Sequence, residues 1–264
     1  MTLSEHLEIR PEEGPFDRLV TDGGYVGIFR TIGCIGDSLS SGEFEWLDEN
    51  GNCGSYGNYP YSWGQYLARD AGCTVYNFSR GGMTASEYLR QFAEEQGFWA
   101  EDKLCQAYIL ALGVNDILNQ HQPLGSVADI DRSDWTKNAP TFAGNYAAII
   151  QRLKEKQPYA RFFLVTMPDD EPSNPQKAAH AALLHELAVL FDRTFVIDLF
   201  AHAPAQTEEY RRKYYMSGHL NAAGYRLTAW MIESYIDWLI RRDPQEFAAA
   251  GFIGTQAYNV TVPR

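Results

Sequence analysis

The sequence has no apolar run near the roughly 18 residues that a membrane-spanning helix needs. It is also poor in positive charge, with 22 Lys and Arg against 34 Asp and Glu and a formal net charge of −12. Such a surface repels phosphate backbones and anionic lipid, so we expect neither a membrane span nor a nucleic-acid partner. The acidic start, residues 1–16, lacks the apolar stretch of a secretion signal.

Metal-binding and redox motifs are missing as well. The four cysteines contain no C-x-x-C pair, and three of them lie in apolar, strand-like runs that favour buried free thiols. No H-E-x-x-H occurs, and His180 and His185 lie about 140° apart around a predicted helix, so they do not share a face as two metal ligands would. We therefore expect no metal, no cofactor and a reducing, cytoplasmic location.

The 264 residues instead show a regular alternation of strand-like and helix-like segments. Apolar strands are predicted at 29–36, 73–79, 105–113, 160–167 and 194–200, and helices at 62–72, 84–99, 141–157, 175–191 and 221–242. This order predicts an α/β fold, a three-layer α/β/α sandwich with a five-stranded parallel sheet of flavodoxin-like topology. We expect a single domain over residues 1–264, with a core of about 29–241 and appendages at both ends.

Two predicted connections, 37–61 and 114–140, exceed the usual length, which is typical of binding loops or lids. The first of them is rich in tyrosine and tryptophan. These rings could stack on a sugar or line an acyl pocket, or they could pack the loop onto the domain.

Four residues suited to acyl transfer follow the predicted strands. Ser38 lies in "GDSLS" after the first strand, Gly82 in "NFSRGGMT" after the second, and Asn115 in "GVND" after the third. His219 lies in "SGHLN", beyond the fifth strand. Ligands of an open parallel sheet bind outside the carboxyl ends of its strands, so we expect these four residues to meet at one edge.

The chemistry of ester cleavage needs this set of residues. A serine hydroxyl is a weak nucleophile until a base such as His219 takes its proton. Attack on a carbonyl then creates a negative oxygen that fixed hydrogen-bond donors must stabilise. The backbone N–H groups of Ser38 and Gly82 and the side-chain amide of Asn115 would form this oxyanion hole.

These blocks, in this order, resemble the SGNH hydrolases, also called the GDSL esterase/lipase family. The resemblance covers roughly residues 29–241 and implies a Ser38 nucleophile, a His219 base and an oxyanion hole from Ser38, Gly82 and Asn115. It also implies the α/β sandwich predicted above and ester hydrolysis without a metal.

One position departs from the family pattern. An aspartate usually stands three residues before the histidine, and this chain has Met216 there. A methionine side chain cannot orient an imidazole, so we expect either the Met216 backbone carbonyl or another acid to do so. Asp198, at the end of the fifth predicted strand, is the best substitute acid, and Asp169 and Asp170 are further candidates.

The sequence therefore predicts a serine esterase for short-chain carboxylic esters, with acetyl esters of carbohydrates among the candidate substrates. The alternatives are a lysophospholipase or lipase-type acylhydrolase, and a catalytically impaired domain that only binds a ligand. A nucleotide or phosphate binder of flavodoxin-like fold is a weaker alternative, because "GDSLS" lacks the glycine spacing of a phosphate-binding loop. The oligomeric state does not follow from the sequence.

Overall fold

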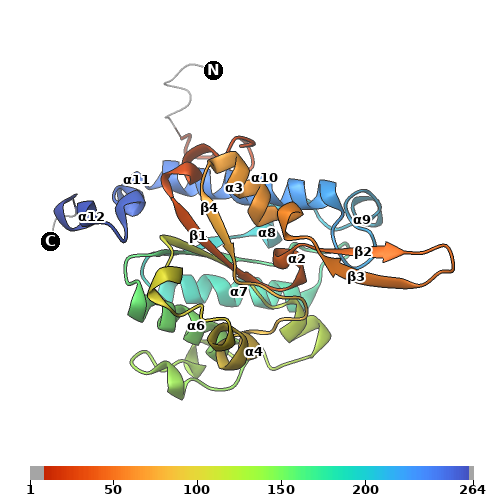
Figure 1. Cartoon of the computed structure of the whole chain (residues 1–264), viewed down its shortest axis with the longest axis horizontal. Helices are drawn as coiled ribbons and strands as arrows, with labels where there is room; N and C mark the ends of the chain where they lie inside the picture. Colours follow the sequence, from red (N-terminus) through yellow and green to blue (C-terminus); the bar gives the residue numbers. More distant parts are fainter. Residues whose placement is uncertain (1–8, 262–264) are drawn as a thin grey trace.

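A five-stranded parallel sheet forms the centre of the molecule (Figure 1). The computed structural model describes residues 9–261. Its sheet has the strand order β4-β1-β5-β6-β7, which confirms the predicted flavodoxin-like topology. The bounds of these strands are Thr31–Gly36 for β1, Thr74–Asn77 for β4, Ala107–Ala111 for β5, Arg161–Val165 for β6 and Thr194–Ile197 for β7.

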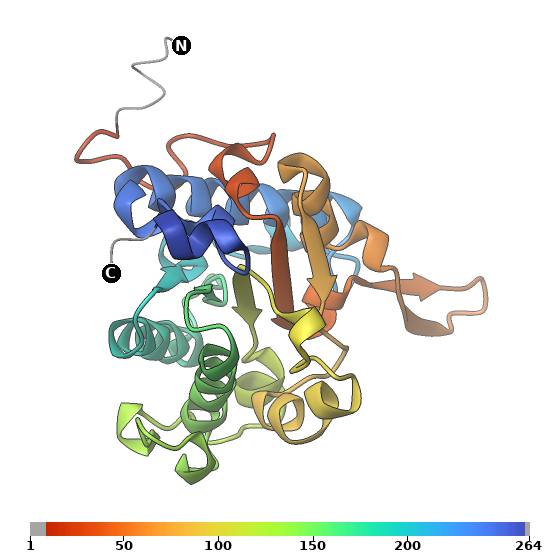
Figure 2. The same ribbon diagram turned by 60° about the vertical axis from the view of Figure 1, so that its left-hand side comes forward.

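Helices cover both faces of this sheet, as the alternating pattern predicts (Figures 1 and 2). One face carries α6 (Phe142–Lys156), α7 (Pro175–Leu190) and a helix that starts as α4 (Ala85–Glu87). The other face carries α3 (Trp63–Ala71) and α10 (Ala222–Arg242). The apolar side chains divide accordingly into two buried clusters, one on each side of the sheet.

The predicted helix starts are confirmed by side-chain caps. Asn174 accepts a hydrogen bond from the Gln176 backbone and precedes Pro175, the first residue of α7. Asn221 caps α10 in the same way through the Gly224 backbone. Each cap bonds one backbone N–H that has no partner inside its helix, which fixes the residue where the helix begins.

The predicted helix 84–99 is divided into three pieces. It runs as α4, a π-helical turn (Tyr88–Phe92) and α5 (Ala93–Glu95). Further short helices are α8 (Leu199–His202), α9 (Glu208–Tyr214), α11 (Pro244–Phe247) and α12 (Gln256–Thr261). A second π-turn spans Val114–Asn119, and 3-10 turns lie at Gly24–Ile28, Tyr59–Tyr61, Glu101–Lys103, Val127–Asp129, Trp135–Lys137 and Ala250–Phe252. Within residues 9–261, none of the helices has the length and apolarity to cross a membrane.

The long connection 37–61 is more structured than the sequence indicated. It begins with a short helix, α2 (Ser38–Ser41), and continues as an antiparallel hairpin of β2 (Glu43–Leu47) and β3 (Cys53–Gly57). Figure 1 shows this hairpin projecting from the body of the molecule at the end of the sheet where β1 finishes. The hairpin therefore starts beside the predicted site and extends away from it.

The segment before the first strand packs against α10. The Trp238 ring nitrogen donates to the Glu13 carbonyl at 2.7 Å, and Arg241 forms an ion pair with the Glu13 carboxylate at 2.6 Å. Farther along, the Val20 N–H donates to the Ser234 hydroxyl at 2.8 Å. Residues 1–8, which include half of the acidic start considered as a secretion signal, lie outside the described residues.

A buried carboxyl connects the turns that follow β4 and β5. Asp116 is completely buried, and its Oδ1 accepts a hydrogen bond of 2.9 Å from the Ala85 N–H at the start of α4. Its Oδ2 is buried without a hydrogen-bond partner. Burial raises the pKa of Asp116 to about 7, although the Ala85 N–H acts in the opposite direction.

This shift predicts a pH dependence of stability. The unfolded carboxyl has its ordinary pKa near 3.8 and the folded one a pKa of about 7. The protonated Asp116 carboxyl therefore contributes its full stabilisation of the fold below the pKa of the unfolded state, and this contribution is lost as the pH rises through the pKa of the folded state. Asp116→Asn keeps an acceptor for Ala85 and has no charge. The free energy of unfolding of the wild type should fall between about pH 5.5 and about pH 8. In Asp116→Asn this fall should be smaller by about 1–2 kcal/mol.

Urea unfolding at the two pH values measures this difference. The exposed Asp243→Asn is the matched control, because the Asp243 side chain caps no helix. Equal pH dependence in wild type and Asp116→Asn would show that Asp116 does not titrate in this range.

Candidate active site

The turn after β1 presents Ser38 as the first residue of α2. Asp37 caps this helix, because its Oδ1 accepts a hydrogen bond of 3.0 Å from the Leu39 N–H. The Asp37 side chain is buried, which raises its pKa to about 6 although the Leu39 N–H and the nearby His219 both lower it. Asp37 thus bonds nearby backbone and holds Ser38, which is partly exposed, at the carboxyl edge of the sheet.

Two further predicted residues lie at the ends of the strands on either side of β1. Gly82, after β4, has a left-handed φ of 72°, which an L side chain rarely adopts, and a Cβ built on it would meet no atom within 4 Å. Asn115, after β5, donates from its side-chain amide to the Met83 carbonyl at 3.2 Å. The amide of Asn115 and the Gly82 turn are therefore adjacent.

The donors needed for an oxyanion hole are available. Among the described residues, no acceptor is bonded to the backbone N–H of Ser38 or of Gly82. The Asn115 amide carries two hydrogens and uses one on Met83. These N–H groups can bind a developing negative oxygen.

His219 lies in a tight turn between α9 and α10. The turn is closed by the backbone pair Tyr215–Leu220 and by the Met216 N–H, which donates to the His219 carbonyl at 2.8 Å. In the first turn of α10, the Tyr225 hydroxyl donates its one proton to the Glu43 carbonyl at 2.6 Å, and the Ser38 carbonyl lies 3.4 Å from the same hydroxyl. This tyrosine links the start of α10 to residues 38–43, the segment that begins with Ser38.

The group that contacts Nδ1 of His219 is Glu45, on β2. The distance from Nδ1 to Glu45 Oε1 is 3.0 Å, and the Gly218 N–H donates to the same oxygen at 2.9 Å. The expectation that the Met216 carbonyl orients His219 is therefore wrong. Met216 contributes its N–H to the turn, and its side chain is half exposed.

Asp198 is also wrong as the orienting acid, because its side chain bonds other groups. Its Oδ2 lies 2.7 Å from His185 Nε2, and its Oδ1 accepts from the Thr166 hydroxyl and from the Ala201 N–H. Asp198 caps α8, on the far side of β6 from Ser38. Asp169 and Asp170 bond their own loop, with Asp170 paired to Lys177 and Arg211.

A second carboxylate, Glu43, lies beside the other ring nitrogen. Glu43 Oε2 is 3.9 Å from His219 Nε2. Its Oε1 lies so close to Gly81 that a Cβ on that glycine would be 1.8 Å away. Glu43 therefore stands between the predicted base and the glycine turn that carries Gly82.

Sequence reasoning missed both glutamates because it treated 43–63 as an aromatic loop. The signal was present in "EFEWL", where charged and aromatic residues alternate with the period of a strand. That alternation puts Glu43 and Glu45 on one face of β2 and Phe44 and Trp46 on the other. The alternation alone does not show which of these two faces of β2 lies toward His219.

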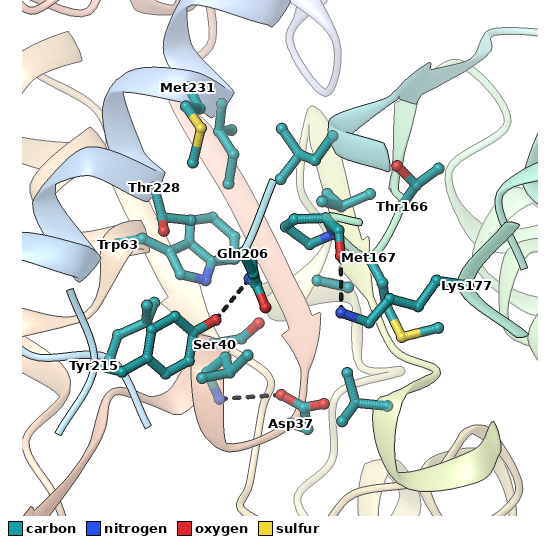
Figure 3. A pocket seen from close by; sticks show the side chains of 18 of the residues that line it. Asp37, Ser40, Trp63, Thr166, Met167, Lys177, Gln206, Tyr215, Thr228 and Met231 are labelled. Atoms are coloured by element: carbon teal, nitrogen blue, oxygen red, sulfur yellow. Dashed lines mark hydrogen bonds between the residues drawn. The ribbon is translucent and has the colours of Figure 1, made fainter. Parts of the chain in front are cut away.

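A cavity of about 200 Å³ borders the site, and Figure 3 shows its labelled side chains. Asp37, Leu39 and Gly218, which flank Ser38 and His219 along the chain, contribute to its lining. Most of the remaining lining is apolar and comes from the strand ends, the starts of α3 and α8, the turn before α10 and α10 itself, including Trp63, Met167, Leu199, Leu220, Met231 and Ile232. Ser38, His219, Gly82 and Asn115 do not line it.

Metal ligands do not gather in the part of the chain that the structure describes. Residues 9–261 contain no group of three or more His, Cys, Asp or Glu side chains suited to hold an ion. His180 is buried with Nε2 3.2 Å from the Leu112 carbonyl, and burial lowers its pKa to about 4. The four cysteines are free, with Cys34 and Cys105 buried.

Comparisons with solved structures find related folds. One is a family two carbohydrate esterase from Clostridium thermocellum in complex with cellohexaose, at 15% identity and a TM-score of 0.55 over 82% of this chain. This chain spans 65% of that esterase. Another is a carbohydrate esterase family 3 protein from Talaromyces cellulolyticus, at 12% identity and a TM-score of 0.52 over 80% of this chain and 98% of that one.

A third related structure is the psychrotrophic esterase EstA from Pseudoalteromonas, inhibited by monoethylphosphonate. It has 16% identity and a TM-score of 0.51 over 80% of this chain and 98% of that chain. No curated protein matches the sequence. Among families, residues 34–227 match the GDSL-like Lipase/Acylhydrolase family, a span from the nucleophile strand into the last long helix. Because this match covers most of the chain, the protein belongs to the GDSL-like lipase/acylhydrolase family of ester-bond hydrolases.

Proposed function

We propose that this protein is a serine esterase with Ser38 as nucleophile and His219 as base. The observation that carries the proposal is the arrangement of strand ends. Ser38, Gly82 and Asn115 follow β1, β4 and β5, which are hydrogen-bonded neighbours, and Tyr225 joins the His219 side of the site to Ser38. The family membership of the chain supports the same chemistry.

In the proposed reaction, His219 Nε2 takes the Ser38 hydroxyl proton as Oγ attacks the acyl carbon. The N–H groups of Ser38 and Gly82 and the Asn115 amide stabilise the negative oxygen of the tetrahedral intermediate. Protonated His219 gives its proton to the departing alcohol, which leaves an ester on Ser38. Water attacks this acyl-enzyme with His219 as base again, and the acid is released.

Among the described residues, the Ser38 hydroxyl and the His219 ring share no hydrogen bond. Catalytic hydrogen bonds in unliganded enzymes are often long and shorten when substrate binds. Nε2 instead has the Glu43 carboxylate at 3.9 Å. The proposed first step therefore requires the Ser38 hydroxyl and Nε2 of His219 to approach each other when substrate binds.

For the substrate we propose short-chain esters, in particular acetyl esters of carbohydrates. Two of the related folds are carbohydrate esterases. The hairpin and the loop after it also expose aromatic rings, with Trp46, Tyr56 and Tyr61 each 44–50% exposed. Flat rings with polar edges bind sugar faces by stacking. Trp63 of the same segment is buried and packs the core.

A longer-chain acylhydrolase is the second candidate, and the apolar cavity beside the site favours it. The cavity reaches Asp37 and Leu39 but not Ser38 itself. An acyl chain attached to Ser38 would have to pass between these residues to enter it.

Ser38→Ala should abolish turnover of p-nitrophenyl acetate and labelling by a fluorophosphonate, because both need the Oγ nucleophile. Ser40→Ala is the matched control. It lies on the same short helix, and its buried hydroxyl has no hydrogen-bond partner to lose. Circular dichroism of both variants checks the fold. Wild-type turnover or labelling in folded Ser38→Ala would overturn the assignment.

A panel of p-nitrophenyl esters from acetate to dodecanoate tests the acyl length. We expect kcat/KM to be highest for acetate and to fall with chain length, and acetylated sugars to be deacetylated. A maximum at eight or more carbons would instead assign the cavity to the acyl chain.

A further inference from the structure

We propose that Glu45 is the positioning acid of the catalytic histidine and that the β2–β3 hairpin supplies it. This inference rests on the proposed function and adds a third member, Ser38–His219–Glu45, to its site. The acid thus comes from seven residues after the nucleophile, whereas the family pattern has it three residues before the histidine.

The contact geometry is that of an acid orienting an imidazole. Glu45 Oε1 lies 3.0 Å from Nδ1, the ring nitrogen that does not act on the serine. An ionised carboxylate only accepts hydrogen bonds, so it favours the tautomer with a proton on Nδ1 and leaves the Nε2 lone pair free to act as base. Nδ1 has no other hydrogen-bond partner among the described residues.

The same glutamate oxygen also fixes the backbone next to the histidine. The Gly218 N–H donates to Oε1 at 2.9 Å. The carboxylate and imidazole are mostly buried, with 22% and 21% of their side chains exposed, so water competes weakly for the contact. Two donors from the His219 turn therefore converge on one oxygen, which restricts both the ring and its loop.

The structure of the hairpin explains why Glu45 reaches the histidine. Phe44 is 8% exposed and packs against Tyr225 at a ring-centre distance of 5.0 Å, so the face of β2 opposite Glu45 is anchored to α10. Tyr225 also binds the Glu43 carbonyl. Because side chains alternate along a strand, anchoring Phe44 leaves Glu43 and Glu45 on the other face.

Glu43 differs from Glu45 in the nitrogen that it approaches. Its carboxylate lies 3.9 Å from Nε2, the nitrogen that must receive the Ser38 proton. Within residues 9–261, the hydrogen bond at Nδ1 is made by Glu45. A carboxylate beside Nε2 cannot set the tautomer that general-base catalysis needs. The positioning role therefore falls to Glu45 alone.

Glu45→Gln is the main test variant. The amide can present an N–H donor to Nδ1 and so favour the wrong tautomer. We expect kcat for p-nitrophenyl acetate to fall strongly, by up to the roughly 10⁴-fold that an Asp-to-Asn change causes in a serine-protease triad, with KM changed little. Glu45→Asp keeps the charge on a shorter side chain and should recover part of this loss. Glu49→Gln, in the exposed hairpin turn, is the matched control and should behave as wild type.

The ¹⁵N shifts of the His219 ring give a readout that a merely structural role would not move. Wild type should hold the proton of the neutral ring on Nδ1, and Glu45→Gln should shift the neutral ring toward the Nε2–H tautomer. The folded state of each variant is checked by its thermal unfolding midpoint.

The outcomes separate the two proposals. If Ser38→Ala is inactive but folded Glu45→Gln keeps kcat within about threefold and the same tautomer, the role of Glu45 is refuted and the esterase proposal stands. If Ser38→Ala stays active, the esterase assignment itself fails. Should Glu45→Gln not fold, the decision passes to Glu45→Asp, whose shorter side chain weakens the contact with Nδ1. A lowered kcat together with a partial shift of the neutral ring toward Nε2–H supports the role of Glu45, and a wild-type kcat despite such a shift refutes it.

Discussion

The site depends on the parallel pairing of β4, β1 and β5. Parallel neighbours end at the same edge, so the backbone hydrogen bonds between these strands bring three separate turns together. Ser38 leaves the middle strand, and Gly82 and Asn115 leave the strands on either side. The spacing of Ser38, Gly82 and Asn115, the proposed nucleophile and oxyanion donors, is therefore set by the sheet, which is far stiffer than a loop.

The histidine side of the site is attached differently. His219 belongs to a turn that no strand of the main sheet carries, and the hairpin and α10 locate it. The Tyr225 hydroxyl donates to the Glu43 carbonyl and lies 3.4 Å from the Ser38 carbonyl, and Phe44 packs against the Tyr225 ring. The contacts of Tyr225 and Phe44 link α2, the hairpin and the start of α10. A displacement of any one of these elements would therefore change the distance between Ser38 and His219.

The charge around the site also bears on what it can bind. Glu43 and Glu45 place two carboxylates beside His219, and Asp37 lies behind Ser38. A neutral acyl group suits these surroundings better than an anionic one, because like charges at short range repel strongly in a partly buried site. The proposed acetyl esters of neutral sugars meet this condition.

The sheet and the order of its strands could be predicted from the sequence, and so could the turns that carry Ser38, Gly82 and Asn115 at the sheet edge. Apolar strands, capped helices and the blocks around Ser38, Gly82, Asn115 and His219 are local patterns, and parallel topology converts their order along the chain into proximity. The sequence could not determine which acid faces Nδ1. Met216 stands at the family's acid position and Asp198 at a strand end, and both are local features of the sequence. Glu45 reaches the ring because Phe44 packs on Tyr225. The alternation of side chains along β2 defines its two faces but does not say which of them turns toward His219. Packing of Phe44 against the distant helix α10 settles this, and such packing exists only in the folded chain.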